Sequence, residues 1–277
     1  MKPKIPKSIQ FGAISSSLAA ATLLTVNVTP AQAFSFTTNK TGSDPKGLIE
    51  LNSIQLDDGT VIDDFSFINE ARIVSNDEYS GGNTGAASAD IGDNLTSSPD
   101  TGMKKENLSE NELHVNLNNL NLNSIIDTED NGNFAMDLFF DKAVDNLLVW
   151  ERGMNSKLGV QAIDREGNLL GRYLEVNSKN WDYAGYNIDT QEIGSAQRVG
   201  ARGISMAELG VEDKYITGFR FISESSFNGP DWKILGTDVT RGGKVPLETE
   251  SVPEPGTMAG LLAVGGLLVA SRRRRRS

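Results

Sequence analysis

The sequence predicts a mostly β protein, an antiparallel β-sandwich of the jelly-roll or immunoglobulin-like kind with long loops. Short apolar or alternating runs recur along the chain between turn residues, at the spacing expected of such a fold. The 277 residues include 28 glycines and only 7% aromatic residues, which suits a chain with many turns. Helical patterning is sparse, and no repeat of fixed period indicates a solenoid or a propeller.

The candidate strands follow one another along the chain. In residues 134–140 the apolar side chains alternate with Asp137, so one face of that strand is expected to be buried. Asp58-Gly59 and residues 166–168 are typical hairpin turns. A short helical turn is predicted at residues 205–209, ending at Gly210. Strands are predicted at residues 34–38, 48–56, 61–68, 113–117, 134–140, 145–151, 158–163, 169–175, 183–188, 215–222 and 232–239.

Two segments interrupt this pattern. Residues 76–112 are rich in Gly, Ser, Asn and Asp and contain few large apolar side chains, which predicts a long flexible loop or excursion. Residues 116–123 alternate Asn and Leu, a pattern that would suit a further strand with one polar face.

The charges are distributed unevenly. Residues 34–251 hold 18 basic and 36 acidic side chains, a net charge of −18, whereas both ends of the chain are basic. An acidic surface repels phosphate backbones, so we expect no binding to nucleic acid. The absence of Cys and the single His114 exclude disulfides, thiolate nucleophiles and paired-His metal sites.

Residues 1–33 have the order of a secretory signal peptide. Lys2, Lys4 and Lys7 precede an apolar run at residues 11–28, and a small-x-small cleavage site follows at Ala31 and Ala33. We expect signal peptidase to leave Phe34 as the first residue. The alternative is an uncleaved N-terminal anchor.

The C-terminal end has three parts in order after the exported domain at residues 34–241 and a polar spacer at 242–251. The motif Val252, Pro253, Glu254 and Pro255 precedes an apolar segment at residues 256–270, about 22 Å long as a helix. A cluster of arginines follows this segment. Positive side chains favour the cytoplasmic side of a membrane, so the cluster is expected to keep the C-terminal end of the segment in the cytoplasm. The cluster consists of Arg272, Arg273, Arg274, Arg275 and Arg276.

This arrangement resembles the PEP-CTERM sorting signal of exosortase substrates. The resemblance implies that a membrane-embedded exosortase removes the anchor, so that the protein contacts the membrane only transiently and reaches the cell surface or extracellular matrix. The two prolines keep the recognition segment extended and exposed. The alternative is a permanent membrane anchor.

Residues 134–236 also resemble a family of exosortase-dependent surface proteins found mainly in cyanobacteria. The similarity implies display at the surface and no particular activity. It is carried by residues 138–141, 144–156, 183–186 and 229–233.

Two groups of aromatic residues are candidates for binding glycans. Trp150 with Glu151, Arg152 and Asn155 could stack on a sugar ring and bond its hydroxyls. The alternative is a core Trp150 beside an ion pair. A second group consists of Trp181, Tyr183 and Tyr186, for which ordinary cross-strand packing is the alternative.

A calcium site is a further candidate at Asp127, Glu129 and Asn131, because oxygen ligands alternate there. The EF-hand pattern fails, since Glu129 occupies its third position and Leu138 its twelfth. A solvated turn is the alternative, and no other cofactor is expected.

No catalytic motif is present, so we expect the protein not to be an enzyme. The first hypothesis is an exported structural or adhesive protein of a biofilm or exopolysaccharide. A carbohydrate-binding module on the cell surface is the second. A secreted hydrolase with a carboxylate pair is the third.

Overall fold

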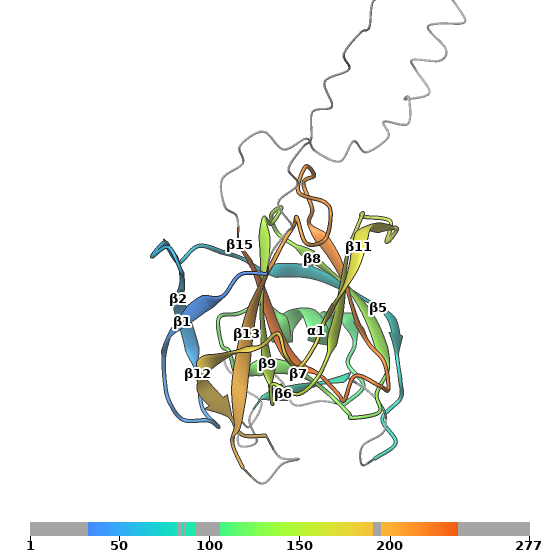
Figure 1. Cartoon of the computed structure of the whole chain (residues 1–277). Helices are drawn as coiled ribbons and strands as arrows, with labels where there is room; N and C mark the ends of the chain where they lie inside the picture. Colours follow the sequence, from blue (N-terminus) through green and yellow to red (C-terminus); the bar gives the residue numbers. More distant parts are fainter. Residues whose placement is uncertain (1–32, 82–84, 86, 92–105, 191–194, 238–277) are drawn as a thin grey trace, which may run out of the picture. The chain divides into compact units, whose positions relative to one another are not determined.

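Three antiparallel sheets and one helix form the part of the chain that the computed structural model describes, residues 33–81, 85, 87–91, 106–190 and 195–237 (Figure 1). All of these residues belong to the compact unit 31–277. The sheets pack against one another as the predicted β-sandwich, with an additional small sheet on one side.

The first layer is a five-stranded sheet. Its strands lie in the order β11 (Leu169–Val176), β10 (Leu158–Ile163), β14 (Gly218–Ser223), β8 (Phe134–Phe140) and β5 (Ile68–Asn76). The second layer is a seven-stranded sheet in the order β12 (Asp182–Ile188), β13 (Gln197–Ser205), β9 (Asn146–Arg152), β15 (Asp231–Thr237), β7 (Ser124–Thr128) and β6 (Ala87–Ile91), with β4 (Phe65–Ser66) also paired to β15.

The third layer is a small sheet of β1 (Phe36–Thr41), β2 (Glu50–Leu56) and β3 (Val61–Ile62). The turn between β2 and β3 is the predicted hairpin: Asp58 accepts from the backbone N–H of Thr60, and Gly59 has a φ of 87°. The 164–168 turn before β11 is likewise confirmed, with Gly167 at a φ of 86°.

The central strands of the seven-stranded sheet are buried on both faces. On β9, Leu147 and Val149 lie in the core shared with the five-stranded sheet, whereas Leu148 and Trp150 lie in a second core beneath the small sheet. Alternating side chains of a strand point to opposite faces, so a strand covered on both sides is apolar throughout. This arrangement explains why six of the seven residues of β9 and all seven of β15 are buried.

The strand predicted at residues 113–117 is wrong, because these residues belong to helix α1 (Glu110–Leu117). Ser109 and Glu112 form a capping box, in which the Ser109 side chain accepts from the Glu112 backbone and the Glu112 carboxylate accepts from the Ser109 N–H. Leu113 and Leu117 are four residues apart, so both reach the main core from one face of the helix.

The strand considered for residues 116–123 is also absent. Asn116, Asn121 and Asn123 are buried and bond backbone groups instead of pairing as a strand. Within the excursion predicted at 76–112, residues 87–91 form β6, which pairs with β7. Residues 92–105 lie outside the described part of the chain.

Candidate functional site

A pocket of about 270 Å³ lies at one end of the seven-stranded sheet, where β7 and β9 end and β13 and β15 begin. Strand ends and the loops that follow them supply its walls, so side chains from four strands converge there. The pocket is lined by Asp127, Thr128, Glu129, Asp130, Arg152, Asn155, Ser156, Gln197, Asn228, Gly229 and Asp231.

Strand register brings the charged residues of this pocket together. Arg152 on β9 pairs directly with Asp231 on β15, and Trp232 pairs with Ile126 on β7. The antiparallel register therefore places Asp231 beside Asp127, although more than 100 residues separate them in sequence. All three side chains alternate onto the face that carries Trp150.

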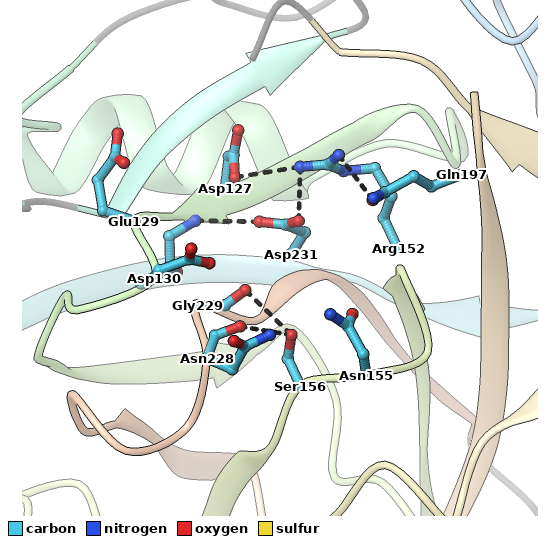
Figure 2. A pocket seen from close by; sticks show the side chains of 11 residues that line it. Asp127, Glu129, Asp130, Arg152, Asn155, Ser156, Gln197, Asn228, Gly229 and Asp231 are labelled. Atoms are coloured by element: carbon cyan, nitrogen blue, oxygen red, sulfur yellow. Dashed lines mark hydrogen bonds and ion pairs between the residues drawn. The ribbon is translucent and has the colours of Figure 1, made fainter. Parts of the chain in front are cut away.

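The guanidinium of Arg152 binds both aspartates (Figure 2). Its Nη2 lies 2.6 Å from Oδ2 of Asp231 and 3.5 Å from Oδ1 of Asp127, and its Nη1 donates to Gln197 at 3.0 Å. The Thr128 N–H donates to the other oxygen of Asp231 at 3.2 Å. Side-chain exposures of 2% for Arg152, 5% for Asp127 and 10% for Asp231 show that water screens these contacts little.

The carboxyl group of Asp231 has an altered proton affinity. Burial raises the pKa of Asp231 well above its ordinary value, and the contacting carboxyl of Asp127 adds to the rise, although Arg152 acts in the opposite direction. A carboxyl pair beside one guanidinium therefore retains a proton more readily than exposed aspartates would.

Two loops complete the pocket wall. Gly153 and Met154 have φ values of 106° and 58°, and this turn carries Asn155 to the pocket. The Ser156 hydroxyl then donates to the carbonyl oxygens of Asn228 at 2.6 Å and Gly229 at 3.2 Å. The hydroxyl thereby ties the loop after β9 to the loop before β15.

Gly229 is required by the close approach of two backbones. Its φ is 47°, and a Cβ atom at this position would lie 2.1 Å from the carbonyl oxygen of Thr128. Any larger residue would push the 228–229 turn away from β7 and widen the pocket.

The structure separates the first predicted glycan-binding group. Arg152 and Asn155 line the pocket, but Trp150 is 1% exposed and its indole N–H donates to Thr38 beneath the small sheet. Its ring also packs edge-on against Phe36. The stacking of Trp150 on a sugar is therefore corrected to the core alternative, because the small sheet covers this face of β9.

Glu151 does not line the pocket, because alternation points it to the opposite face of β9 from Arg152. It is fully buried. Burial raises the pKa of Glu151 to about 8, although the positive charge of Arg152 acts in the opposite direction. The carboxyl is therefore largely protonated at neutral pH.

The second aromatic group is not a shared platform. Trp181 lies in the main core, Tyr186 lies in the core beneath the small sheet, and both are about 5% exposed. Tyr183 alone is exposed, and the guanidinium of Arg198 lies 4.0 Å from its ring centroid. Tyr183 and Tyr186 are three residues apart on β12, so one side chain is exposed and the other is buried on the opposite face of the strand.

The predicted calcium ligands do not form a matching donor set. Asp127 and Glu129 line the pocket and Asn131 does not, and Asp127 contacts Arg152. Within the described ranges, no three His, Cys, Asp or Glu side chains gather closely enough to hold a metal ion. The residues therefore do not fit the calcium site expected from the sequence.

Sequence reasoning missed Asp231, Gln197 and Asn228. These residues lie at strand starts and in a loop, where isolated polar residues are common. The sequence indicates Asp231 only by its position directly before the apolar-rich run at residues 232–235, at the start of a strand.

The C-terminal end of the chain matches a known sorting motif. Residues 251–276 match the family model of the PEP-CTERM protein-sorting motif. The chain carries a PEP-CTERM sorting signal. The signal implies an exported protein that exosortase processes and that is anchored in the membrane or displayed at the cell surface. No curated protein and no solved structure matches the chain.

The predicted signal peptide and the C-terminal sorting region lie almost entirely outside the described residues. This holds for residues 1–32, for the spacer at 242–251, for the sorting motif and for the membrane segment at 256–270. Among the helices of the described residues, none is both long and apolar enough to cross a bilayer. The resemblance to the cyanobacterial family stays a prediction, since the matched motif covers only the tail.

The described residues begin at Ala33, beside the predicted signal-peptidase site. Phe34 pairs its backbone with Gly203 of β13, and a Cβ atom on Gly203 would lie 2.2 Å from the Phe34 ring. The first residue expected after cleavage is thus already part of the folded domain.

Proposed function

We propose that the protein is an adhesive component of the cell surface or extracellular matrix that binds carbohydrate in the pocket at the end of the seven-stranded sheet. The observation that carries this proposal is the pocket itself, in which one buried guanidinium, several carboxyl groups and several amides converge. The sorting motif adds that the protein is exported, so this pocket would face the cell surface or the matrix. Such a concave site with a few fixed polar groups is the usual form of a small-ligand site.

The chemistry of the lining suits sugar hydroxyls. A hydroxyl both donates and accepts hydrogen bonds, and the pocket offers carboxylate acceptors together with amide groups that do both. Arg152 and Ser156 hold the walls in place before any ligand arrives, so binding would cost little conformational entropy. Recognition here would rely on hydrogen bonds, since no aromatic side chain of the described residues lines the pocket.

Binding without catalysis is the function we favour for this pocket. Glycoside hydrolysis uses two carboxyl groups roughly 5–10 Å apart that flank the scissile bond. Asp127 and Asp231 instead contact each other and the same nitrogen of Arg152. This arrangement supports a binding role over the hydrolase considered from the sequence.

A binding assay with point variants tests the proposal. The exported protein is incubated with extracellular polysaccharide from the producing cells, and the retained fraction is measured. Asn155→Ala and Asn228→Gly remove exposed amides of the pocket, and glycine suits the φ of 62° at residue 228. Each should reduce retention severalfold.

Asn111→Ala is the matched control, because Asn111 is an exposed amide on α1 away from the pocket lining. Urea unfolding verifies that all variants fold. Retention that is equal in the pocket variants, the control and the unchanged protein would exclude the pocket as the adhesive site.

Processing is tested separately from adhesion. We propose that exosortase cleaves near residues 252–255, so the surface form should lack the arginine cluster in its intact mass and begin at Phe34. Changing Pro253 and Glu254 together to Ala should leave the tail in place and the protein in the membrane fraction. Normal removal of the tail from that variant would contradict this step.

A further inference from the structure

Lys233 places a primary amine inside the seven-stranded sheet. It is fully buried on β15, where the strand register pairs it with Trp150 of β9. Alternation puts it on the same face of β15 as Leu235, which lies in the core beneath the small sheet. Burial lowers the pKa of Lys233 to about 7, so near neutral pH much of the protein carries a neutral amine there. A neutral, desolvated lysine amine is a nucleophile.

The amine lies against the side-chain amide of Asn119. Its Nζ is 3.1 Å from Oδ1 of Asn119, a residue 114 positions earlier in the chain. The amide carbon Cγ is bonded to Oδ1 at about 1.23 Å, so it lies no more than about 4.3 Å from Nζ. Reacting atoms held roughly 3–3.5 Å apart are in near-attack geometry, which a small rotation of either side chain would produce.

The surroundings of Asn119 suit an attack on its Cγ. The N–H of Asn121 donates to Oδ1 of Asn119 at 3.0 Å, so it would stabilise the negative charge that develops on this oxygen during the attack. The Nδ2 group of Asn119 donates to the carbonyl oxygen of Asn116 at 3.0 Å, which holds the amide plane in place beside the amine.

Glu50 supplies a carboxylate at the same junction. It forms a β-bridge with Asn121, and the next residue, Leu51, donates its N–H to the carbonyl oxygen of Leu120 at 3.0 Å. The negative charge of Glu50 acts on Lys233 by raising its pKa, against the larger effect of burial. A carboxylate that interacts with an attacking amine can accept its proton and return it to the leaving group.

We propose that Lys233 and Asn119 become joined by an intramolecular isopeptide bond. The Nζ–Cγ bond forms and the Cγ–Nδ2 bond breaks, while one proton passes from Nζ through Glu50 to Nδ2, which leaves as ammonia. The chain loses about 17 Da, and neither an oxidant nor a reductant takes part. This inference is independent of carbohydrate binding.

The bond would give this exported chain a covalent link without cysteine. The sequence contains no Cys, so disulfides are excluded. A link between residues 119 and 233 closes a loop of more than 100 residues, and closing so long a loop reduces the entropy of the unfolded chain, as a disulfide does. The bond also removes the titrating amine, so the effect of Lys233 on the pH dependence of stability belongs to the unreacted chain.

The alternative is a lysine that only caps helix α1. Its Nζ also donates to the carbonyl oxygen of Leu117 at 3.0 Å, a contact that an unreacted side chain makes equally well. The two accounts differ in covalent structure, so mass spectrometry separates them.

The test is peptide mapping of the full-length processed protein after denaturation and digestion with trypsin. We expect the peptide of residues 106–142 to be joined to that of residues 221–241, with no cleavage after Lys233 and the mass of one ammonia missing. The joined peptide is decisive, because other reactions of asparagine also release ammonia. Two separate peptides with cleavage after Lys233 would overturn the proposal.

Variants identify the groups that take part. Asn119→Ala should abolish the joined peptide. Glu50→Gln, which keeps the size of a half-buried side chain, should reduce the joined fraction at least tenfold while urea unfolding verifies that the variant folds. Asn118→Ala is the matched control and should keep the bond, because Asn118 is exposed and contacts His114. A full yield of joined peptide in Glu50→Gln would overturn the proton transfer through Glu50.

Discussion

The five-stranded and seven-stranded sheets differ in how far their arginine side chains are exposed to water. On the outer face of β8, Asp137 receives two hydrogen bonds from Arg220 at 2.6 and 2.8 Å, and the ring of Phe139 lies beneath Arg72 and Arg165. These arginines remain 20–53% exposed and act as a cover between the sheet and water. In the seven-stranded sheet, Arg152 is 2% exposed.

The difference follows from the number of layers. The five-stranded sheet has one covered face, so its long cationic side chains reach water while their stems pack on apolar groups. The small sheet and the five-stranded sheet cover both faces of the seven-stranded sheet, and charges there must be paired inside the protein or neutralised. Buried charge concentrates at the strand ends of the covered sheet, and the pocket lies at that position.

Lys233 illustrates the cost of charge in the covered sheet. It is fully buried on β15, and its Nζ donates to the carbonyl oxygen of Leu117 at 3.0 Å and to the side chain of Asn119 at 3.1 Å. It thereby caps the C-terminal end of α1, where the helix dipole is negative. Burial nevertheless lowers the pKa of Lys233 to about 7.

The largest effect is expected from Arg152→Met. Removing the guanidinium leaves Asp127 and Asp231 buried without their cation, which should lower the free energy of unfolding by about 3–5 kcal/mol. Urea unfolding at pH 7 measures the loss. Adding Asp231→Asn should restore part of it, because one buried charge is then gone; an unchanged midpoint in the single variant would show that the network contributes nothing.

The next effect concerns Glu151 and pH. The pKa of Glu151 rises from an ordinary 4.5 to about 8 in the folded protein. Between pH 4.5 and pH 8, Glu151 is therefore protonated in the folded protein and deprotonated in the unfolded chain. Stability should therefore fall as pH rises from 5 to 8, with a limiting slope of about 1.4 kcal/mol per pH unit for this group.

Glu151→Gln should remove that decline, because the amide stays neutral at every pH. Chemical unfolding at several pH values, compared with the unchanged protein, provides the measurement. A variant that loses stability over this range as steeply as the unchanged protein would assign the decline to other groups.

Lys233 should produce a slope of the opposite sign. Between pH 7 and 10.5 the unfolded chain binds a proton that folded Lys233 has lost, so this group makes stability rise with pH there. Lys233→Met should abolish the rise and weaken α1, which circular dichroism at 222 nm would report. Persistence of the rise in the variant would contradict a buried, neutralised lysine.

The smallest effect is expected on the exposed face. Arg220→Met removes the partner of Asp137 where water can partly replace it, so the loss should be about 1–2 kcal/mol, well below that of Arg152→Met. The same urea experiment compares the two. Equal losses would mean that the number of covering layers does not decide the cost.

The sandwich could be predicted because its signals are local. The alternation in β8 and the glycine turns at Gly59 and Gly167 each span a few residues, and the structure confirms them. Helix α1 was missed because residues 113–117 alternate like a strand, although Ser109 and Glu112 form a capping box that marks a helix start.

The site could be predicted only in part because it depends on long-range register. Arg152 and Asn155 stood out in a dense polar segment, but nothing near them in sequence points to Asp231 or Gln197. The burial of Trp150 follows from the small sheet packing over β9, a contact with residues more than 100 positions earlier in the chain. A single sequence does not contain that information.

The most direct measurement is a titration of the isotope-labelled, processed protein with an oligomer prepared from the extracellular polysaccharide, followed by amide NMR. Our account requires the shifting signals to cluster at residues 127–130, 152–156, 197 and 228–231, around the strand ends of the covered sheet. Shifts confined to the arginine-covered face of the five-stranded sheet, or none at saturating oligomer, would contradict it.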